Sequence, residues 1–319
     1  MSRFIPLLAT FAVLIGLFTT ASLMYERFFT ARVVANLFSD NAVLGIMAIG
    51  MTFVILSGGI DLSVGAVLAF TATLVGSLIM KHSWHPVAAI TTSMALGTLF
   101  GAGMGYLIHR YEMPPFLVTL GGMFFARGMA FVVSSESLAI EHEFYTAIQD
   151  FRIVVGPKAK LKAVALIFLG LLVTAIFIAH WTPFGRNIYA IGGNETSAKL
   201  MGLPVAMTKI SVYAFNGFCS ALAGVTTTLY MGSGNPAGAY GEELNAIASV
   251  VIGGTLLTGG VGFVAGTLGG VLIFGTIQSA LIFDGRLNSW WLRIAIGVLL
   301  LIFILMQRYL TRITHLKKN

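Results

Sequence analysis

The chain has 319 residues, of which 57% are hydrophobic and only 10% are charged. This composition leaves too little polar surface for a soluble globular protein and indicates an integral membrane protein. The formal net charge of +7 does not indicate a nucleic-acid partner, because the basic residues are scattered over loops and do not gather on one face. The single cysteine, Cys219, excludes an intrachain disulfide.

Apolar segments near the length needed to cross roughly 30 Å of hydrocarbon recur along the whole chain. They predict an all-α, polytopic membrane protein with about ten transmembrane helices, folded as a single domain over residues 1–319. The expected spans are residues 4–23, 42–57, 62–80, 86–108, 116–133, 162–180, 209–231, 244–258, 261–283 and 290–307. The segments 42–57 and 244–258 are short, so each is expected to be half of a discontinuous helix, which would lower the count to about eight.

Residues 56–65, LSGGIDLSVG, interrupt one apolar run with glycines and a carboxylate. Backbone groups and a charge at such a break are tolerated only beside protein or a cavity. We therefore expect Gly58, Gly59, Asp61 and Ser63 to lie near a translocation path or its gate. The Asp61 carboxylate would accept hydrogen bonds either from the hydroxyls of a ligand or from free backbone N–H groups at the start of the next helix.

A second glycine-rich break repeats the spacing of the first. SGGI at residues 57–60, followed by Gly65, matches TGGV at 258–261, followed by Gly266. Each follows a short apolar run and precedes a longer one, so the match predicts two broken helices in comparable positions of a repeated fold, unless it arose by chance. The residues expected beside the second break are Asn245, Gly259 and Gly260.

Arg127 falls in the middle of the expected span 116–133, where an unpaired guanidinium is costly. It should therefore contact backbone carbonyls or a carboxylate, for which Asp61 is a candidate. Its role would be either on the translocation path or as a brace between helices. Glycines at fourfold spacing predict close helix packing in two other segments. These are Gly97, Gly101, Gly105 and Gly262, Gly266, Gly270.

Residues 184–204, FGRNIYAIGGNETSAKLMGLP, follow the sixth expected span and predict a small helix in a loop. Asn194 is a good N-cap, Glu195 favours the positive end of the helix dipole, and Gly202 is a natural C-terminal stop. About two turns would result, with Ala198 and Met201 exposed on one side. Such a helix either docks into a groove of another protein or lies on lipid.

Basic residues crowd just beyond the last expected span and indicate a cytoplasmic C-terminus. They are Arg308, Arg312, Lys317 and Lys318. With an even number of crossings, the loop 184–204 then also faces the cytoplasm. Acidic residues fall on the opposite, outer side, either as solvated loop charges or as a docking face for a basic partner. They are Glu136, Glu141, Glu143, Glu242 and Glu243.

The sequence contains no Gly-Lys-Ser/Thr phosphate loop, so energy for transport would come from a partner or an ion gradient. It also lacks a nucleophile elbow, a paired-carboxylate site and a zinc-ligand helix. The six histidines lie in loops or at segment ends, with no spacing that builds a metal site. We therefore expect no enzyme activity, no metal and no cofactor.

Four ordered motifs together resemble permeases of the ribose/xylose/arabinose class of bacterial ABC importers, over nearly the whole chain. They are GIDLSVG at 59–65, PFLVTLGGMFFARG at 115–128, FGRNIYAIGGNETSAKLMG at 184–202 and ELNAIASVVIGGTLLTGGVG at 243–262. Within that class, FDG at 283–285 and NSWW at 288–291 are most similar to one of the two permeases of the galactofuranose importer.

The resemblance implies a multi-pass subunit of the bacterial inner membrane that works with a periplasmic sugar-binding protein and a cytoplasmic ATP-binding subunit. Galactofuranose implies a heterodimer with a second, homologous permease. The resemblance also implies that the loop contacts the ATPase through Gly192, Gly193, Asn194, Glu195, Ala198, Met201 and Gly202. Two alternatives stay open, an ion-coupled secondary sugar transporter that uses Asp61 and a membrane scaffold that transports nothing.

Overall fold

The computed structural model describes residues 5–156, 158–286 and 290–316, with side chains from residue 6 to residue 306. The helices of this part are α1 (Ile5–Met24), α2 (Ala31–Asp40), α3 (Ala42–Leu56), α4 (Val64–Met80), α5 (Pro86–Arg110), α6 (Pro115–Val133), α7 (Glu143–Asp150), α8 (Ala163–Trp181), α9 (Pro183–Gly193), α10 (Glu195–Leu200), α11 (Val205–Met231), α12 (Glu242–Ile252), α13 (Val264–Asp284) and α14 (Trp290–Leu316). The strands are β1 (Leu138–Ala139), β2 (Arg152–Gly156), β3 (Ala159–Lys162) and β4 (Ser233–Gly234).

The all-α, polytopic fold class is confirmed, whereas the count of ten spans is not. Six of the described helices are long and apolar enough to cross a membrane: α1, α5, α6, α8, α11 and α13. A seventh span results if α2 and α3, which meet at a bend of 55°, are counted together. α4 and the apolar part of α14, Trp290–Met306, are shorter apolar helices, and α12 has only 11 residues.

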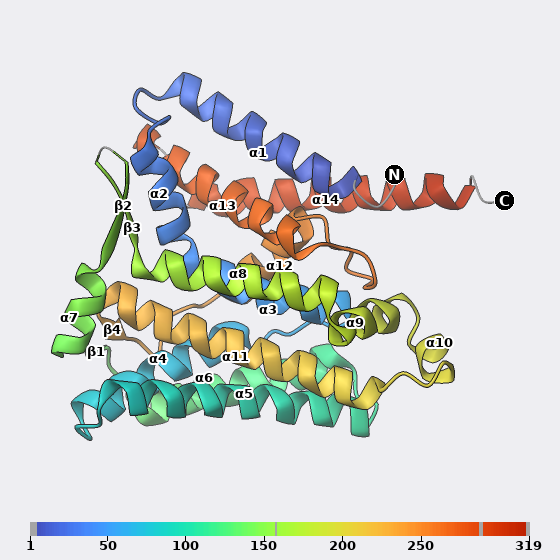
Figure 1. Cartoon of the computed structure of the whole chain (residues 1–319), viewed down its shortest axis with the longest axis horizontal. Helices are drawn as coiled ribbons and strands as arrows, with labels where there is room; N and C mark the ends of the chain where they lie inside the picture. Colours follow the sequence, from blue (N-terminus) through green and yellow to red (C-terminus); the bar gives the residue numbers. More distant parts are fainter. Residues whose placement is uncertain (1–4, 157, 287–289, 317–319) are drawn as a thin grey trace.

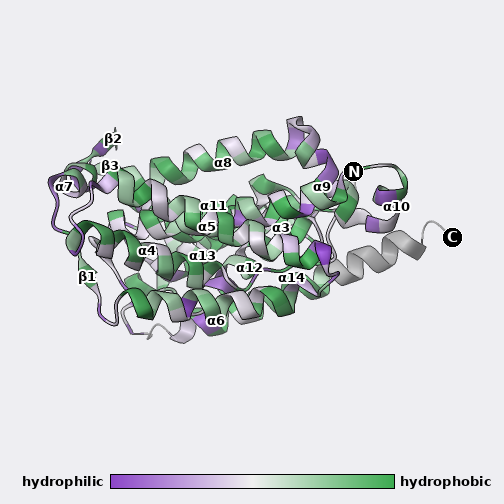
Figure 2. Cartoon of the chain, turned by 90° about the horizontal axis from the view of Figure 1, so that it is seen from below, coloured by the Kyte–Doolittle hydropathy of each residue, from purple (hydrophilic) through white to green (hydrophobic). Residues whose placement is uncertain are grey.

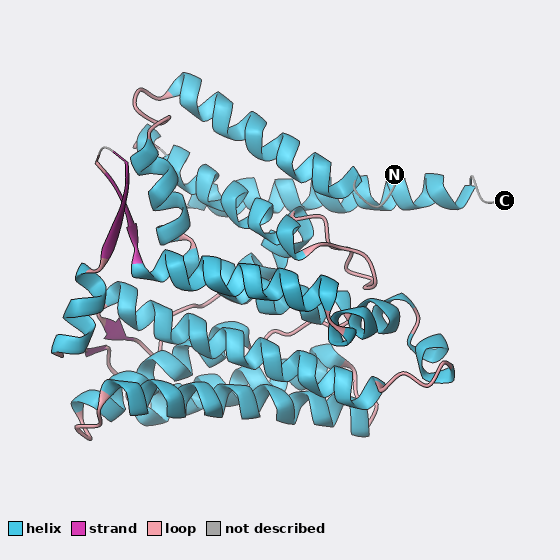
Figure 3. Ribbon diagram, in the orientation of Figure 1, coloured by secondary structure: helices cyan, strands magenta, loops and turns pink. Residues whose placement is uncertain are grey.

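The long helices run side by side, and the two ends of the molecule differ (Figure 1). The start of α1, the end of α14, α9 and α10 lie at one end, and α7 with the β2–β3 hairpin lies at the other (Figures 1 and 3). Hydrophobic residues follow the length of the long helices, and hydrophilic residues gather mainly at the two ends (Figure 2). This pattern fits a membrane around the middle of the molecule, with the loop 184–204 and the end of α14 on the same side of it.

Helix α11 packs against α3, α4 and α5, and the first glycine series makes the closest of these contacts. A Cβ at Gly97 would lie 2.6 Å from the Cβ of Ala221, and a Cβ at Gly101 would overlap the carbonyl oxygen of Tyr213. Gly105 faces Ile210 in the same way. The predicted seam is therefore confirmed, because α5 approaches α11 to a distance that leaves no room for a side chain.

The second glycine series is only partly a helix seam. Gly266 and Gly270 of α13 pack against the carbonyls of Gly253 and Ser249 at the end of α12. Gly262 lies outside this seam, because α13 begins only at Val264 and Gly262 belongs to the connection that precedes it. Of the two motifs that suggested galactofuranose, residues 288 and 289 of NSWW lie outside the described residues.

Candidate translocation and coupling sites

The two breaks expected from the repeated glycine pattern lie against each other. The first joins α3 to α4, and the second joins α12 to α13. The backbone N–H of Gly260 donates to the carbonyl of Leu56, with N and O 2.9 Å apart. A Cβ at Gly259 would lie 2.9 Å from the Cα of Gly58. Gly58, Gly259 and Gly260 all have positive φ, which favours glycine at each position. Gly259 and Gly260 also leave no room for a Cβ.

Helix α9, which the sequence did not predict as an element separate from α10, meets both breaks. A Cβ at Gly192 would overlap the carbonyl oxygen of Leu56, and one at Gly260 would lie 2.6 Å from the backbone nitrogen of Gly193. The hydroxyl of Tyr189 donates to the carbonyl of Gly262 over 2.9 Å. Burial raises the pKa of Tyr189 to about 12, so the hydroxyl keeps the proton that it donates.

The carboxylate of Asp61 is 1% exposed and acts as a local cap. It accepts from the backbone N–H of Ser63 at 2.8 Å and from the Ser63 hydroxyl at 2.7 Å, where α4 begins. It also accepts from the side-chain amide of Asn216 on α11 at 2.8 Å. Of the two expectations for Asp61, the structure shows bonding to a backbone N–H at a helix start. Gly59 allows the close approach of the Tyr213 hydroxyl beside it.

Arg127 pairs with backbone carbonyls, and the suggested partner Asp61 was wrong. Its guanidinium donates to the carbonyls of Pro236 at 2.9 Å and Gly238 at 2.6 Å and lies 4.0 Å from the ring centre of Tyr240. The segment between α11 and α12 turns its carbonyls toward α6, which provides acceptors without a second buried charge. Arg127 is therefore a brace for this segment.

The expected small helix at Asn194 is α10, and it is capped as predicted. The Asn194 side chain accepts from the backbone N–H of Ser197 at 2.8 Å, and the chain turns away through Gly202, which has a φ of +75°. Glu195 also forms an ion pair with Lys209 at 2.7 Å.

The expected exposure of Ala198 was wrong, because this residue is 0% exposed and packs with Ile191 of α9 and Val205 of α11. The expected exposure of Met201 is confirmed at 69%, and Leu200, the last residue of α10, is 84% exposed. Met207, near the start of α11, is also exposed, at 68%.

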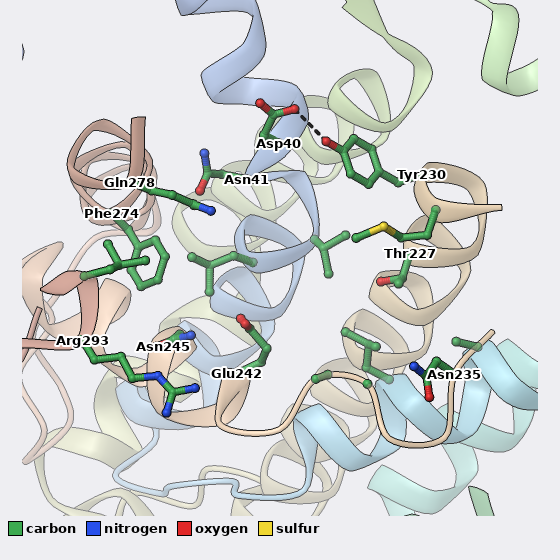
Figure 4. Close-up of a pocket in the computed structure, with 18 of the residues that line it drawn as sticks. Asp40, Asn41, Thr227, Tyr230, Asn235, Glu242, Asn245, Phe274, Gln278 and Arg293 are labelled. Atoms are coloured by element: carbon green, nitrogen blue, oxygen red, sulfur yellow. Dashed lines mark hydrogen bonds between the residues drawn. The ribbon is translucent and has the colours of Figure 1, made fainter. Parts of the chain in front are cut away.

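A cavity of about 670 Å³ has both polar and apolar walls (Figure 4). It reaches Tyr230 and Met231 at the end of α11 and Ser233 of β4. Its polar lining comes from five stretches of the chain. These side chains are Asp40, Asn41, Thr227, Tyr230, Ser233, Asn235, Glu242, Asn245, Gln278 and Arg293. The aromatic rings of Phe274 and Trp290 add flat apolar walls. Amides, carboxylates and aromatic faces together are suited to a small ligand with many hydroxyl groups.

The Asp40 carboxylate lies on one side of the cavity and accepts from the Tyr230 hydroxyl at 2.8 Å (Figure 4). Lys162, at the end of β3, lies 3.9 Å from the same carboxylate and 4.4 Å from the centre of the Tyr230 ring. These contacts tie the bend between α2 and α3 to the end of α11. They hold one wall of the cavity in place.

Of the residues expected on the translocation path, Asn245 is the one that lines this cavity. Gly58, Gly259 and Gly260 meet at the breaks, Asp61 and Ser63 form the cap of α4, and Arg127 supports the cavity wall at Gly238 from outside. The placement of Glu242 among loop charges on an outer docking face was wrong, because Glu242 begins α12 and faces the cavity (Figure 4).

Sequence reasoning missed Asp40, Asn41, Gln278 and Arg293. Their signal was present, since each is a polar residue within or beside an apolar run.

Two short helices connect the cavity to the breaks. The first residues of α3 and α12 line the cavity, and their last residues lead into the two glycine-rich connections. The two helices also pack against each other. Cavity and breaks are therefore opposite ends of one pair of helices.

Comparison with known proteins assigns the family. The model of the family described as branched-chain amino acid transport system / permease component matches residues 33–304. The chain belongs to this family. It is a multi-pass membrane protein of the permease type, as the candidate spans and the family together require.

Several named permeases are similar over almost their whole length. The inner membrane ABC transporter permease protein YjfF of Escherichia coli (strain K12) is 47% identical over 97% of this chain and 93% of its own. The fructose import permease protein FruG of Bifidobacterium longum is 37% identical over 96% of this chain and 91% of its own. The ribose import permease protein RbsC of Bacillus subtilis is 37% identical over 97% and 93%. No solved structure matches the chain.

Proposed function

We propose that the chain is one membrane subunit of a bacterial ABC importer that carries a monosaccharide, galactofuranose, inward across the cytoplasmic membrane. The names of the fructose and ribose permeases support sugar as the substrate class. The FDG motif at 283–285 supports the choice of galactofuranose. The chain itself is not an enzyme, and ATP is hydrolysed on a separate cytoplasmic subunit.

The observation that carries this proposal is the cavity with its polar side chains. Ligand pockets commonly measure about 300–1,000 Å³, so a cavity of about 670 Å³ accommodates a monosaccharide with water around it. Asn41, Asn245 and Gln278 offer amides that both donate and accept, as sugar hydroxyls require.

We assign one proposed partner to each end of the molecule. A periplasmic sugar-binding protein would deliver sugar at the end with α7 and the strands, and an ATP-binding subunit would contact the coupling loop 184–204 at the other. A second, homologous permease completes the membrane part as a heterodimer. The whole chain forms a single transmembrane permease domain.

The ion-coupled alternative gains no support from Asp61. Its carboxylate already accepts three hydrogen bonds from Ser63 and Asn216 and lies outside the cavity lining. A coupling ion or proton would have to break this cap before it could bind. We therefore place energy coupling on the partner ATPase.

Uptake of labelled galactofuranose tests the proposal in a host strain that lacks this chain and is complemented with variants. We expect uptake to stop when the partner ATPase is inactivated and to survive collapse of the proton gradient. Asn245→Ala and Gln278→Ala should each lower uptake about tenfold, the effect of losing about 1.5 kcal/mol of hydrogen bonding. Thr174→Val, on the exposed face of α8, is the control. If uptake stops only when the proton gradient is collapsed, the proposal is contradicted. If labelled ribose is taken up in preference to galactofuranose, ribose replaces galactofuranose as the proposed substrate.

A further inference from the structure

Three segments far apart in the sequence meet backbone to backbone at the end of α9. We name Gly58, Gly192, Gly259 and Gly260 the glycine junction. A Cβ on Gly192 would overlap the carbonyl oxygen of Leu56, and a Cβ on Gly259 would lie 3.0 Å from the carbonyl oxygen of Gly192. Because no side chain separates these segments, a displacement of one has no flexible group to absorb it.

The junction lies between the two functional ends of the molecule. On one side, α9 continues through the Asn194 cap into α10, which carries the exposed Leu200 and Met201. On the other side, the junction contacts Leu56, the last residue of α3, and the glycine-rich connection that follows α12. Both of these short helices begin at the cavity. A shift of α9 at the junction would therefore act on two walls of the cavity at once.

We propose that the glycine junction transmits movement of α9 to α3 and α12 together, and so makes access to the cavity depend on the state of the partner ATPase. The inference rests on the proposed function, because it takes α10 as the surface that the ATPase moves. The Tyr189 hydrogen bond to Gly262 ties α9 to the second break as well, so both breaks follow one helix. A rigid element with two discrete packed arrangements can carry coupling between distant sites.

The chain offers a matched pair of substitutions at adjacent positions of α9. Gly192→Ala would push a methyl group into the backbone of Leu56, whereas a Cβ on Gly193 has nothing within 4 Å. Both residues end the same helix, so the helix propensity gained by alanine is similar at the two positions. Tyr189→Phe is the milder third variant, since it keeps the ring and removes only the bond to Gly262.

A reporter cysteine makes the test independent of the sugar. Thr227 lines the cavity on α11, outside α3 and α12, and the native Cys219 is buried. Thr227→Cys in a Cys219→Ala background would be labelled from outside with a membrane-impermeant maleimide, in energised and in ATP-depleted cells. The amount of each variant in the membrane is measured alongside uptake of labelled galactofuranose. Gly170→Ala, on α8 with nothing within 4 Å of the added Cβ, is the control.

We expect the reporter to label at different rates in energised and ATP-depleted cells in the parent, in Gly170→Ala and in Gly193→Ala. Gly192→Ala should abolish this difference and lower uptake about tenfold, the effect of overpacking at a rigid contact. Tyr189→Phe, which should fold normally, should reduce the difference.

An ATP-dependent difference that persists in both Gly192→Ala and Tyr189→Phe would overturn the inference, as would a parent that labels at one rate whatever the ATP supply. If the unmodified chain does not take up galactofuranose while the reporter parent responds to ATP, the proposed substrate would be overturned and the junction would stand.

Discussion

The two charged residues expected deep in the membrane, Asp61 and Arg127, hydrogen-bond to uncharged polar groups and not to each other. Asp61 accepts from the start of α4, and Arg127 donates to the segment before α12. Buried charges are costly unless hydrogen-bonded, and a main-chain partner provides this without a second charge. Each charge therefore fixes an irregular backbone segment beside the cavity or the breaks.

We predict that Asp61→Ala destabilises the protein much more than Asp61→Asn. Alanine leaves the N–H of Ser63 and the amide of Asn216 without an acceptor, at about 1–3 kcal/mol for each buried group. Asparagine keeps an oxygen for Ser63. Its amide can donate to the Asn216 oxygen, which has no partner among the described residues, once the Asn216 amide turns over. The midpoint of thermal unfolding of the purified protein measures both changes. An Asn variant as unstable as the Ala variant would show that the charge itself is needed.

At the scale of elements, close helix approach explains the contact of α5 with α11. We predict that Gly101→Ala destabilises the protein by about 1–3 kcal/mol, because its methyl group would overlap the carbonyl oxygen of Tyr213. Gly103→Ala is the control in the same helix, since its Cβ meets nothing within 4 Å, and alanine there should stabilise α5 slightly. Thermal unfolding of the two variants side by side checks this. Equal unfolding midpoints for the two variants would mean that α5 and α11 can move apart with little loss of stability.

Elements that depend on local chemistry could be predicted from the sequence. The breaks at Gly58 and Gly259, the cap at Asn194 and the stop at Gly202 each follow from residues that are neighbours in the chain. The cavity could not be predicted, because its walls come from α2, α3, α4, α11, α12, α13 and α14, and its polar residues are scattered along the sequence. Burial of Ala198 was missed for the same reason, since α9 and α11 cover it.

At the scale of the whole molecule, α3, α12 and the glycine junction connect the cavity to α9 and α10. Arg308 and Arg312, expected beyond the last span, belong to the part of α14 that extends to the end carrying α10 (Figure 1), whereas Lys317 and Lys318 lie outside the described residues. The opposite end is not purely acidic, because the β2–β3 hairpin brings Arg152, Lys160 and Lys162 there beside Glu141 and Glu143. A binding protein at that end would therefore meet charges of both signs, and salt should weaken its docking only modestly.

The exposed apolar residues Leu200 and Met201, at the end of α10, form the surface that an ATP-binding subunit would cover. We predict that Leu200→Glu lowers recovery of the ATP-binding subunit with this chain about tenfold or more, because a charge at the centre of an apolar contact stays unpaired when buried. Leu200→Met should keep the subunit bound, since the side chain remains apolar and of similar volume.

Ser135→Glu, which adds the same charge at the exposed opposite end, controls for net charge. The measurement is the ratio of the two subunits after purification from membranes, with sugar uptake followed in parallel. If α10 instead lies on lipid, Leu200→Glu would leave this ratio unchanged, because the ATP-binding subunit would not touch Leu200. That result would move the coupling contact to another cytoplasmic surface. A fall in the ratio for Leu200→Glu alone would place the ATPase against α10, one helix away from Gly192.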